Sequence, residues 1–268
     1  MSNNRQNNFL TKSPYASSHR VAVNVLKFLR YVPFAHSFIR LFFSIKTPSL
    51  ERELFGLRFK NPVGIAAGLD RKGEFYNDLG NFGPSFVEIG PIKNVKKTIQ
   101  NLTSYPPKDI ILAVNLNGRL SSDPVLNLKE IEHSFAMIYD FADAIVVTVP
   151  GIGYEAILDN ILTLRRYNDV SKPIIVKITN IVKPEEIHGV VEYSLRNGVD
   201  CIECIVAYLP AVHEQTQGLI PLIALAYLEN ISEARSLLEN GASLISLATG
   251  LLKNGPSFIK RILKTLLK

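Results

Sequence analysis

Short runs rich in valine, isoleucine and leucine recur along the chain from about residue 61 onward. Each run is nearly continuous in hydrophobicity, whereas a strand with one face in water alternates apolar and polar residues. A continuous short run is typical of a strand that is buried on both faces of a parallel sheet. Eight such runs predict eight parallel strands, at 62–67, 86–90, 110–116, 144–150, 173–178, 201–207, 221–227 and 243–249.

Helical patterns separate most of these runs, at 73–80, 94–102, 129–141, 154–167, 184–197, 231–240 and 256–267. Eight strand–helix repeats predict a (β/α)8 TIM barrel of α/β class. A doubly wound open sheet is the alternative, but eight alternating strands favour closure. Only 208–220 separates the sixth and seventh strands, so we expect a reduced barrel whose crossover helix there is missing or short. Gly198 and Gly241 follow predicted helices, where a left-handed cap is expected.

The segment before the barrel has a different composition. Residues 1–19 are polar and predict a disordered tail. Residues 20–47 predict an amphipathic helix pair interrupted at Pro33, and the barrel then spans 48–268. Residues 1–60 hold 10 basic and 2 acidic side chains. Apolar residues with basic flanks suit a membrane interface, although packing of the pair on the barrel is the alternative.

Composition narrows the classes of function. Residues 61–268 hold 20 basic and 22 acidic side chains, which argues against nucleic acid as a partner of the barrel. The two cysteines, Cys201 and Cys204, lie in a predicted strand, so we interpret them as buried thiols rather than a redox pair. No metal-ligand spacing is present. The first 20 residues lack signal-peptide features, and no apolar run approaches the ~18 residues of a span. We expect a cytoplasmic protein, peripheral on the inner membrane face.

Several segments carry a family resemblance. The stretch FGLRFKNPVGIAAGLDRKGE (55–74) resembles the first-strand signature of quinone-dependent (class 2) dihydroorotate dehydrogenases. SLEREL (49–54), FVEIG (86–90), LAVNLNG (112–118), PIIVKI (173–178) and the segment 241–260 resemble further landmarks in order. The resemblance implies a flavoprotein that oxidises dihydroorotate to orotate on FMN and passes the electrons to a membrane quinone. It also implies that the N-terminal helix pair docks on the membrane as the quinone entrance.

The resemblance carries part of a flavin site onto this chain. The small residues at 66–68 would let the flavin approach the backbone, and the turn at 248–250 would bind its phosphate. Lys177 would stabilise negative charge on the flavin ring; because burying a lysine without an anion is costly, it hints at a remaining anion. The implied FMN-binding residues are Ala66, Ala67, Gly68, Asn115, Lys177, Ala248, Thr249 and Gly250.

This chain departs from the family pattern at positions to which the resemblance assigns catalysis and substrate binding. Val149 stands at the position of the family's catalytic base, and valine cannot take a proton. Thr148 is a weak substitute, since a hydroxyl needs an adjacent base to be activated. Val146 and Gly151 replace the substrate-binding asparagines, and Arg71 replaces a substrate-contacting lysine.

Further departures lie after the second, sixth and seventh strands. Pro91 replaces a threonine, and the loop that should carry a substrate motif is absent. Ile205 and Val206 replace a threonine–asparagine pair, and Tyr227 would crowd a phosphate turn that is glycine-rich in the family. Three deletions fall on βα loops, after strands two, four and six, and residues 62–267 give about 206 positions, near the lower end for such barrels.

We therefore expect a divergent dihydroorotate dehydrogenase-like pseudoenzyme that has lost dihydroorotate oxidation. Its cofactor FMN would bind weakly or be absent, and its partners would be a membrane surface or quinone, a paralogue or a second copy. Two alternatives stay open: an FMN oxidoreductase acting on another substrate, and surviving dihydroorotate chemistry with Thr148 as substitute base.

Overall fold

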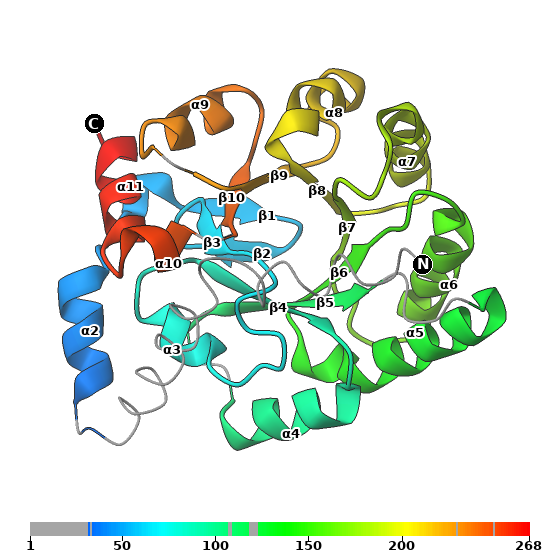
Figure 1. Ribbon diagram of the computed structural model, residues 1–268, viewed down its shortest axis with the longest axis horizontal. Helices are drawn as coiled ribbons and strands as arrows, with labels where there is room; N and C mark the ends of the chain where they lie inside the picture. The colour runs from blue at the N-terminus through cyan, green and yellow to red at the C-terminus, as the bar shows by residue number, and fades with distance from the viewer. Residues whose placement is uncertain (1–31, 33, 107–108, 118–122, 229, 249) are drawn as a thin grey trace.

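The computed structural model describes residue 32 and residues 34–106, 109–117, 123–228, 230–248 and 250–268. Within them, eight parallel strands close into a barrel in the order β10-β3-β4-β5-β6-β7-β8-β9, and helices surround it (Figure 1). The predicted (β/α)8 barrel is confirmed, and the open-sheet alternative is wrong because β10 pairs with both β9 and β3. The predicted tail 1–19 and the first helix of the N-terminal pair lie outside the described residues.

All eight predicted strands are present. They are β3 (Val63–Ile65), β4 (Phe86–Ile92), β5 (Ile111–Asn117), β6 (Ala144–Thr148), β7 (Ile174–Ile178), β8 (Cys201–Ile205), β9 (Leu222–Ala226) and β10 (Leu244–Leu247). The short hairpin of β1 (Arg52–Leu54) and β2 (Leu57–Phe59) precedes the barrel.

The helices are short to medium in length. They are α2 (Ala35–Phe43), α3 (Tyr76–Gly80), α4 (Val95–Ser104), α5 (Pro124–Ile138), α6 (Tyr154–Arg166), α7 (Pro184–Arg196), α8 (Leu209–Thr216), α9 (Glu233–Glu239), α10 (Gly250–Asn254) and α11 (Phe258–Leu266).

Helix α5 begins before the predicted residue 129. The Asp123 side chain accepts the backbone N–H groups of Val125 and Leu126, and Pro124 occupies the first turn. An aspartate cap followed by proline is a strong helix start, and the apolar periodicity on which the prediction rested begins only further along the helix.

The crossover between β8 and β9 is short, as predicted. A 3-10 turn, η4 (Val206–Tyr208), follows β8 directly and continues into the eight-residue helix α8. Gly198 and Gly241 have φ angles of 76° and 97°, which confirms the predicted left-handed positions after α7 and α9.

The barrel interior has an apolar end and a polar layer. Phe59 of the hairpin packs edge-on against Phe86, which lies at the start of β4. Further along the strands, the register places Lys177 of β7 beside Thr148 of β6 and Glu203 of β8. Because side chains on a strand alternate between its two faces, residues at these neighbouring positions point into the same layer of the barrel.

Two hydrogen bonds and one aromatic contact hold helix α2 on the outside of the barrel. Arg40 donates to the side-chain Oδ1 of Asn81 at 3.3 Å, and Lys260 of α11 donates to the main-chain oxygen of Phe42 at 2.6 Å. The Phe43 ring packs against Phe82 with ring centroids 5.8 Å apart. No helix among the described residues is both long and apolar enough to cross a membrane.

Candidate active site

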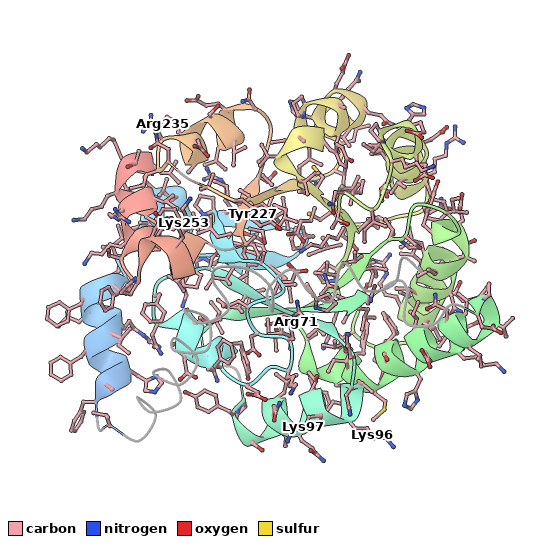
Figure 2. The ribbon with its side chains drawn as sticks, viewed as in Figure 1. Arg71, Lys96, Lys97, Tyr227, Arg235 and Lys253 are labelled. Atoms are coloured by element: carbon pink, nitrogen blue, oxygen red, sulfur yellow. The ribbon has the colours of Figure 1, made fainter. Side chains whose placement is uncertain are left out.

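The carboxyl ends of the strands lie at one end of the barrel, where barrels of this kind place their active sites. Arg71 follows β3 and Tyr227 follows β9, and both lie inside the ring of helices, whereas Lys96 and Lys97 lie on α4 outside it (Figure 2). The sequence-predicted residues therefore converge on this end, but their contacts differ from those that a flavin site implies.

Lys177 is at the centre of the polar layer and only 4% exposed. Its Nζ lies 2.6 Å from Glu88 Oε2, 2.9 Å from Glu88 Oε1 and 3.0 Å from Glu203 Oε2. An ammonium group donates N–H bonds and accepts none, and here it donates to both carboxyl groups. Burial lowers the pKa of Lys177, but the charges of Glu203 and Glu88 outweigh burial and leave its pKa raised.

Glu88 is fully engaged. Asn115 Nδ2 donates to its Oε1 at 2.5 Å, and the backbone N–H of Ala67 donates to its Oε2 at 2.9 Å. Asn115 Nδ2 also lies 3.0 Å from Thr148 Oγ1, and the hydroxyl donates in turn to Asn115 Oδ1 at 3.1 Å. Three of the residues implied for FMN, Ala67, Asn115 and Lys177, thus bind one carboxylate of the protein itself.

Glu203 adds a second carboxyl group beside Lys177, whose charge Glu88 already balances. The cluster of Glu88, Lys177 and Glu203, called here the charge cluster, holds two carboxyl groups and one ammonium group, all buried. Among the described residues, no hydrogen bond of normal geometry reaches Glu203 Oε1 or Ser246 Oγ, although Ser246 is close enough to Glu203 to lower the pKa of its carboxyl group. Burial and the charge of Glu88 raise the pKa of Glu203 to about 7, despite the opposing effect of Lys177. One proton on Glu203 would make the cluster neutral.

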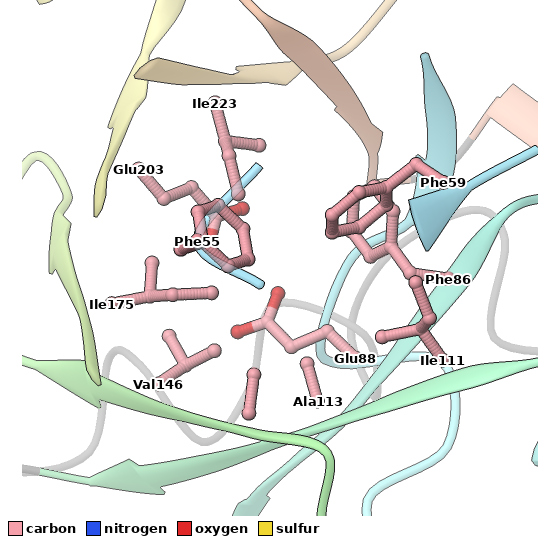
Figure 3. A pocket seen from close by; sticks show the side chains of 11 residues that line it. Phe55, Phe59, Phe86, Glu88, Ile111, Ala113, Val146, Ile175, Glu203 and Ile223 are labelled. Atoms are coloured by element: carbon pink, nitrogen blue, oxygen red, sulfur yellow. The ribbon is translucent and has the colours of Figure 1, made fainter. Parts of the chain in front are cut away.

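A small cavity lies between the charge cluster and the hairpin. Figure 3 shows the carboxyl groups of Glu88 and Glu203 at this cavity, with the rings of Phe55 and Phe59 beside them. The remaining lining is aliphatic or aromatic, and the cavity volume open to the centre of a water molecule is about 10 Å³. That is about the space for one water.

The position that the resemblance assigns to a catalytic base, Val149, holds no acid–base group. Val149 is fully buried, and its backbone N–H donates to the main-chain oxygen of Lys177 at 3.1 Å. Thr148, the weak substitute, exchanges its hydrogen bonds with the amide of Asn115, which cannot take a proton from it.

The βα loops after β4, β6 and β8 are short. Helix α4 begins three residues after β4 ends, and η4 follows β8 without any intervening residue. The five-residue loop after β6 contains an exposed Ile152 and no charged side chain. Loops of this length leave little chain with which to enclose a substrate at this end of the barrel.

The remaining implied flavin residues form ordinary backbone contacts. Ala66 is buried, Gly68 donates to the main-chain oxygen of Gly90 at 2.8 Å, and Ala248 donates to that of Ala226 at 3.1 Å. Gly250 begins the five-residue α10, and Thr249 lies outside the described residues. Their roles toward FMN stay predictions.

Glu88, Glu203 and Ser246 have no role in the sequence-based account of the site. The available signal was an acidic residue inside an apolar strand, in FVEIG (86–90) and CIECIVA (201–207). Because a carboxylate is almost never fully buried without a partner, each such glutamate predicts a buried cation beside it. Lys177 is that cation for both.

The other candidate residues have structural roles. Cys201 and Cys204 are free and buried, and burial raises the pKa of both thiols. Asp70 accepts the backbone N–H groups of Lys72, Glu74 and Phe75, so it holds the loop after β3. Among the described residues, no three histidine, cysteine or acidic side chains are grouped to hold a metal ion.

The hydrogen-bond donors that the resemblance assigns to FMN show whether the cofactor fits this site. The amide of Asn115 and the ammonium of Lys177, which the resemblance assigns to the cofactor, are both buried and direct their N–H groups to protein oxygens. Tyr227, more than half exposed, stands where the resemblance implies a glycine-rich phosphate turn. The residues present do not fit FMN in this arrangement.

Comparisons with known proteins agree on one family. No protein-family model matches the chain. "Dihydroorotate dehydrogenase (quinone)" of Christiangramia forsetii is 25% identical, with 93% of this chain and 94% of that protein covered. The protein of the same name from Thermosynechococcus vestitus is 24% identical, with 85% and 84% covered. The first alignment runs over 321 positions, more than the 268 residues of this chain, so the relative contains segments that this chain lacks.

Solved structures share the fold. Ligand-free DHODH from Eimeria tenella superimposes with a TM-score of 0.70 at 18% identity, covering 87% of this chain and 93% of that one. DHODH from the same organism in complex with ferulenol gives a TM-score of 0.71 at 18% identity, covering 88% and 90%. By sequence over most of its length, the chain is a divergent relative of the quinone-dependent dihydroorotate dehydrogenases.

Proposed function

We propose that this chain is a dihydroorotate dehydrogenase-like barrel that no longer oxidises dihydroorotate. The observation that carries the proposal is the buried, apolar Val149 at the base position, beside a Thr148 hydroxyl bound to an amide. Oxidation of dihydroorotate removes a proton from carbon as well as a hydride, and a positioned base contributes about 10²–10⁴-fold to such a step. This chain lacks the base, and it also lacks the long loops that would hold the substrate. It therefore lacks both the proton acceptor and the means to position dihydroorotate.

Complementation tests this proposal. The chain is expressed in a bacterial strain that lacks its own dihydroorotate dehydrogenase and grows only with added pyrimidine. We expect no growth without pyrimidine when immunoblotting shows soluble protein at the level of a catalytically normal relative expressed in parallel. Growth would instead support the alternative of surviving dihydroorotate chemistry, and the Val146 and Val149 positions would then need another explanation.

The exposed side of α2 supports a membrane surface as partner. Phe34, Phe38, Leu41 and Phe42 are between 59% and 78% exposed, although they are apolar. Side chains of this helix project away from the barrel (Figure 2). Apolar groups presented beside a basic N-terminal segment can enter the boundary between lipid headgroups and acyl chains. We therefore propose peripheral binding to an anionic membrane; association with quinone, a paralogue or a second copy stays a prediction.

Vesicle sedimentation tests the membrane partner. The full chain should co-sediment with vesicles of phosphatidylglycerol and phosphatidylcholine, and the double variant Phe38→Ser and Phe42→Ser should remain in the supernatant. Leu219→Ser is a matched control, because Leu219 is 79% exposed on the loop after α8. Equal binding by the double variant and the control would show that the exposed side chains of α2 do not bind the membrane.

A further inference from the structure

Lys177 has the anions that its burial requires without any cofactor. A buried ammonium costs several kcal/mol unless it is paired, so a lysine in a barrel strand implies a nearby anion. Glu88 and Glu203, from the strands β4 and β8, provide carboxylate oxygens between 2.6 and 3.0 Å from Nζ. Both counter-charges of Lys177 therefore come from the protein itself.

Glu88 alone would balance Lys177, and Glu203 adds a second carboxyl group. Glu203 is 2% exposed, and within the described part of the chain no hydrogen bond of normal geometry reaches its Oε1. With two carboxylates beside one ammonium, this region repels a negatively charged group when Glu203 is ionised. It is neutral when Glu203 holds a proton, and in neither state does it present the positive site that an electron-rich flavin ring needs.

We propose that Glu203 is an internal anion that stands in for the cofactor beside Lys177, so that the barrel completes its polar core without flavin and does not take flavin up. The inference rests on the proposed function and extends it from the lost base to the cofactor. Lys177 is then retained for the stability of the barrel and not for electron transfer. Asn115 has the same role, because its amide joins Glu88 to Thr148.

Flavin binding by the wild-type protein is the first test. Protein purified from flavin-replete cells should release no flavin on acid precipitation, and added FMN should leave the melting temperature unchanged. A ligand at a hundred times its Kd stabilises a folded protein measurably, so true binding would be visible as a saturable rise. Stoichiometric flavin or such a rise would overturn the proposal.

The flavin-free stability of Lys177→Met is the second test. If Lys177 serves the charge cluster, its loss leaves buried carboxylates unpaired and should lower the ratio of folded to unfolded protein by more than about a hundredfold. Lys264→Met, at an exposed position on α11, is the matched control and should change little. If Lys177→Met is as stable as this control, Lys177 has no such role and the proposal fails.

The double variant Lys177→Met and Glu203→Gln covers the case in which Lys177→Met does not fold. Removing one charge of each sign should recover part of the lost stability, and no recovery would contradict pairing between the two residues. The outcomes are separable from those of the proposed function. Bound flavin without dihydroorotate turnover would overturn this inference and leave the loss of activity standing.

Discussion

The buried carboxyl group of Glu203 makes the stability of the barrel depend on pH. Its pKa rises from 4.5 to about 7 in the folded chain, first because of burial and then because of Glu88. Between these two values the folded state holds a proton that the unfolded state releases. The free energy of unfolding therefore falls as pH rises from about 4.5 through 7, and it levels off above 7.

The size of the effect follows from the shift. One pKa unit corresponds to about 1.4 kcal/mol, so this group accounts for a loss of about 3 kcal/mol between acid and alkaline conditions. Surface screening does not reduce this figure much, because the residue is 2% exposed. Glutamine has almost the same shape as glutamate and does not titrate. The free energy of unfolding of Glu203→Gln should therefore lack this loss, and it should increase relative to that of the wild type as pH rises.

Urea unfolding at about pH 5 and about pH 8.5 measures the difference. Far-ultraviolet circular dichroism is the suitable probe, because the chain has no tryptophan. Groups that titrate in both proteins cancel when Glu203→Gln is compared with the wild type at each pH. Glu239→Gln, at an exposed position on α9, controls for loss of a surface carboxylate. Parallel pH profiles for the wild type and Glu203→Gln would refute a buried proton on this residue.

Three further predictions concern packing and the loop after β3. Gly64→Ala should cost about 1–3 kcal/mol in chemical unfolding, because its Cβ would lie 2.2 Å from the buried Phe86 ring. Cys201 and Cys204 should react with a thiol reagent only at the rate of unfolding, since both are buried with raised pKa values; fast labelling of the native protein would contradict this. Asp70→Ala leaves three backbone N–H groups without their acceptor and should cost at least about 2 kcal/mol, whereas an unchanged unfolding midpoint would show that water replaces the carboxylate.

The barrel could be predicted because its strands are buried on both faces. Continuous runs such as PIIVKI (173–178) give a strong signal whatever their partners are, and eight of them leave few topologies. The boundaries of the helices are harder to predict from the sequence. The start of α5 depends on a capping aspartate outside the apolar periodicity, and α8 has too few residues to show a period of its own.

The site could be predicted only in part. Resemblance identifies Lys177 and Asn115 as polar residues of the barrel interior, and the structure places both in one network. What each residue binds depends on side chains from strands that are distant in sequence, since Glu88 lies 89 residues before Lys177. No local pattern specifies that pairing, and a charge supplied by the protein itself removes the need for the charge of a cofactor.

The loss of dihydroorotate oxidation is tested most directly by turnover of the purified full-length protein. Dihydroorotate, a soluble quinone and excess FMN are supplied together, and orotate is measured after long incubation beside a catalytically normal quinone-dependent relative. We predict no orotate above that formed without protein, because Val149 offers no base and the loops after β4, β6 and β8 are short. Orotate formation that scales with protein concentration and disappears in a Thr148→Val variant would contradict it and identify Thr148 as the substitute base.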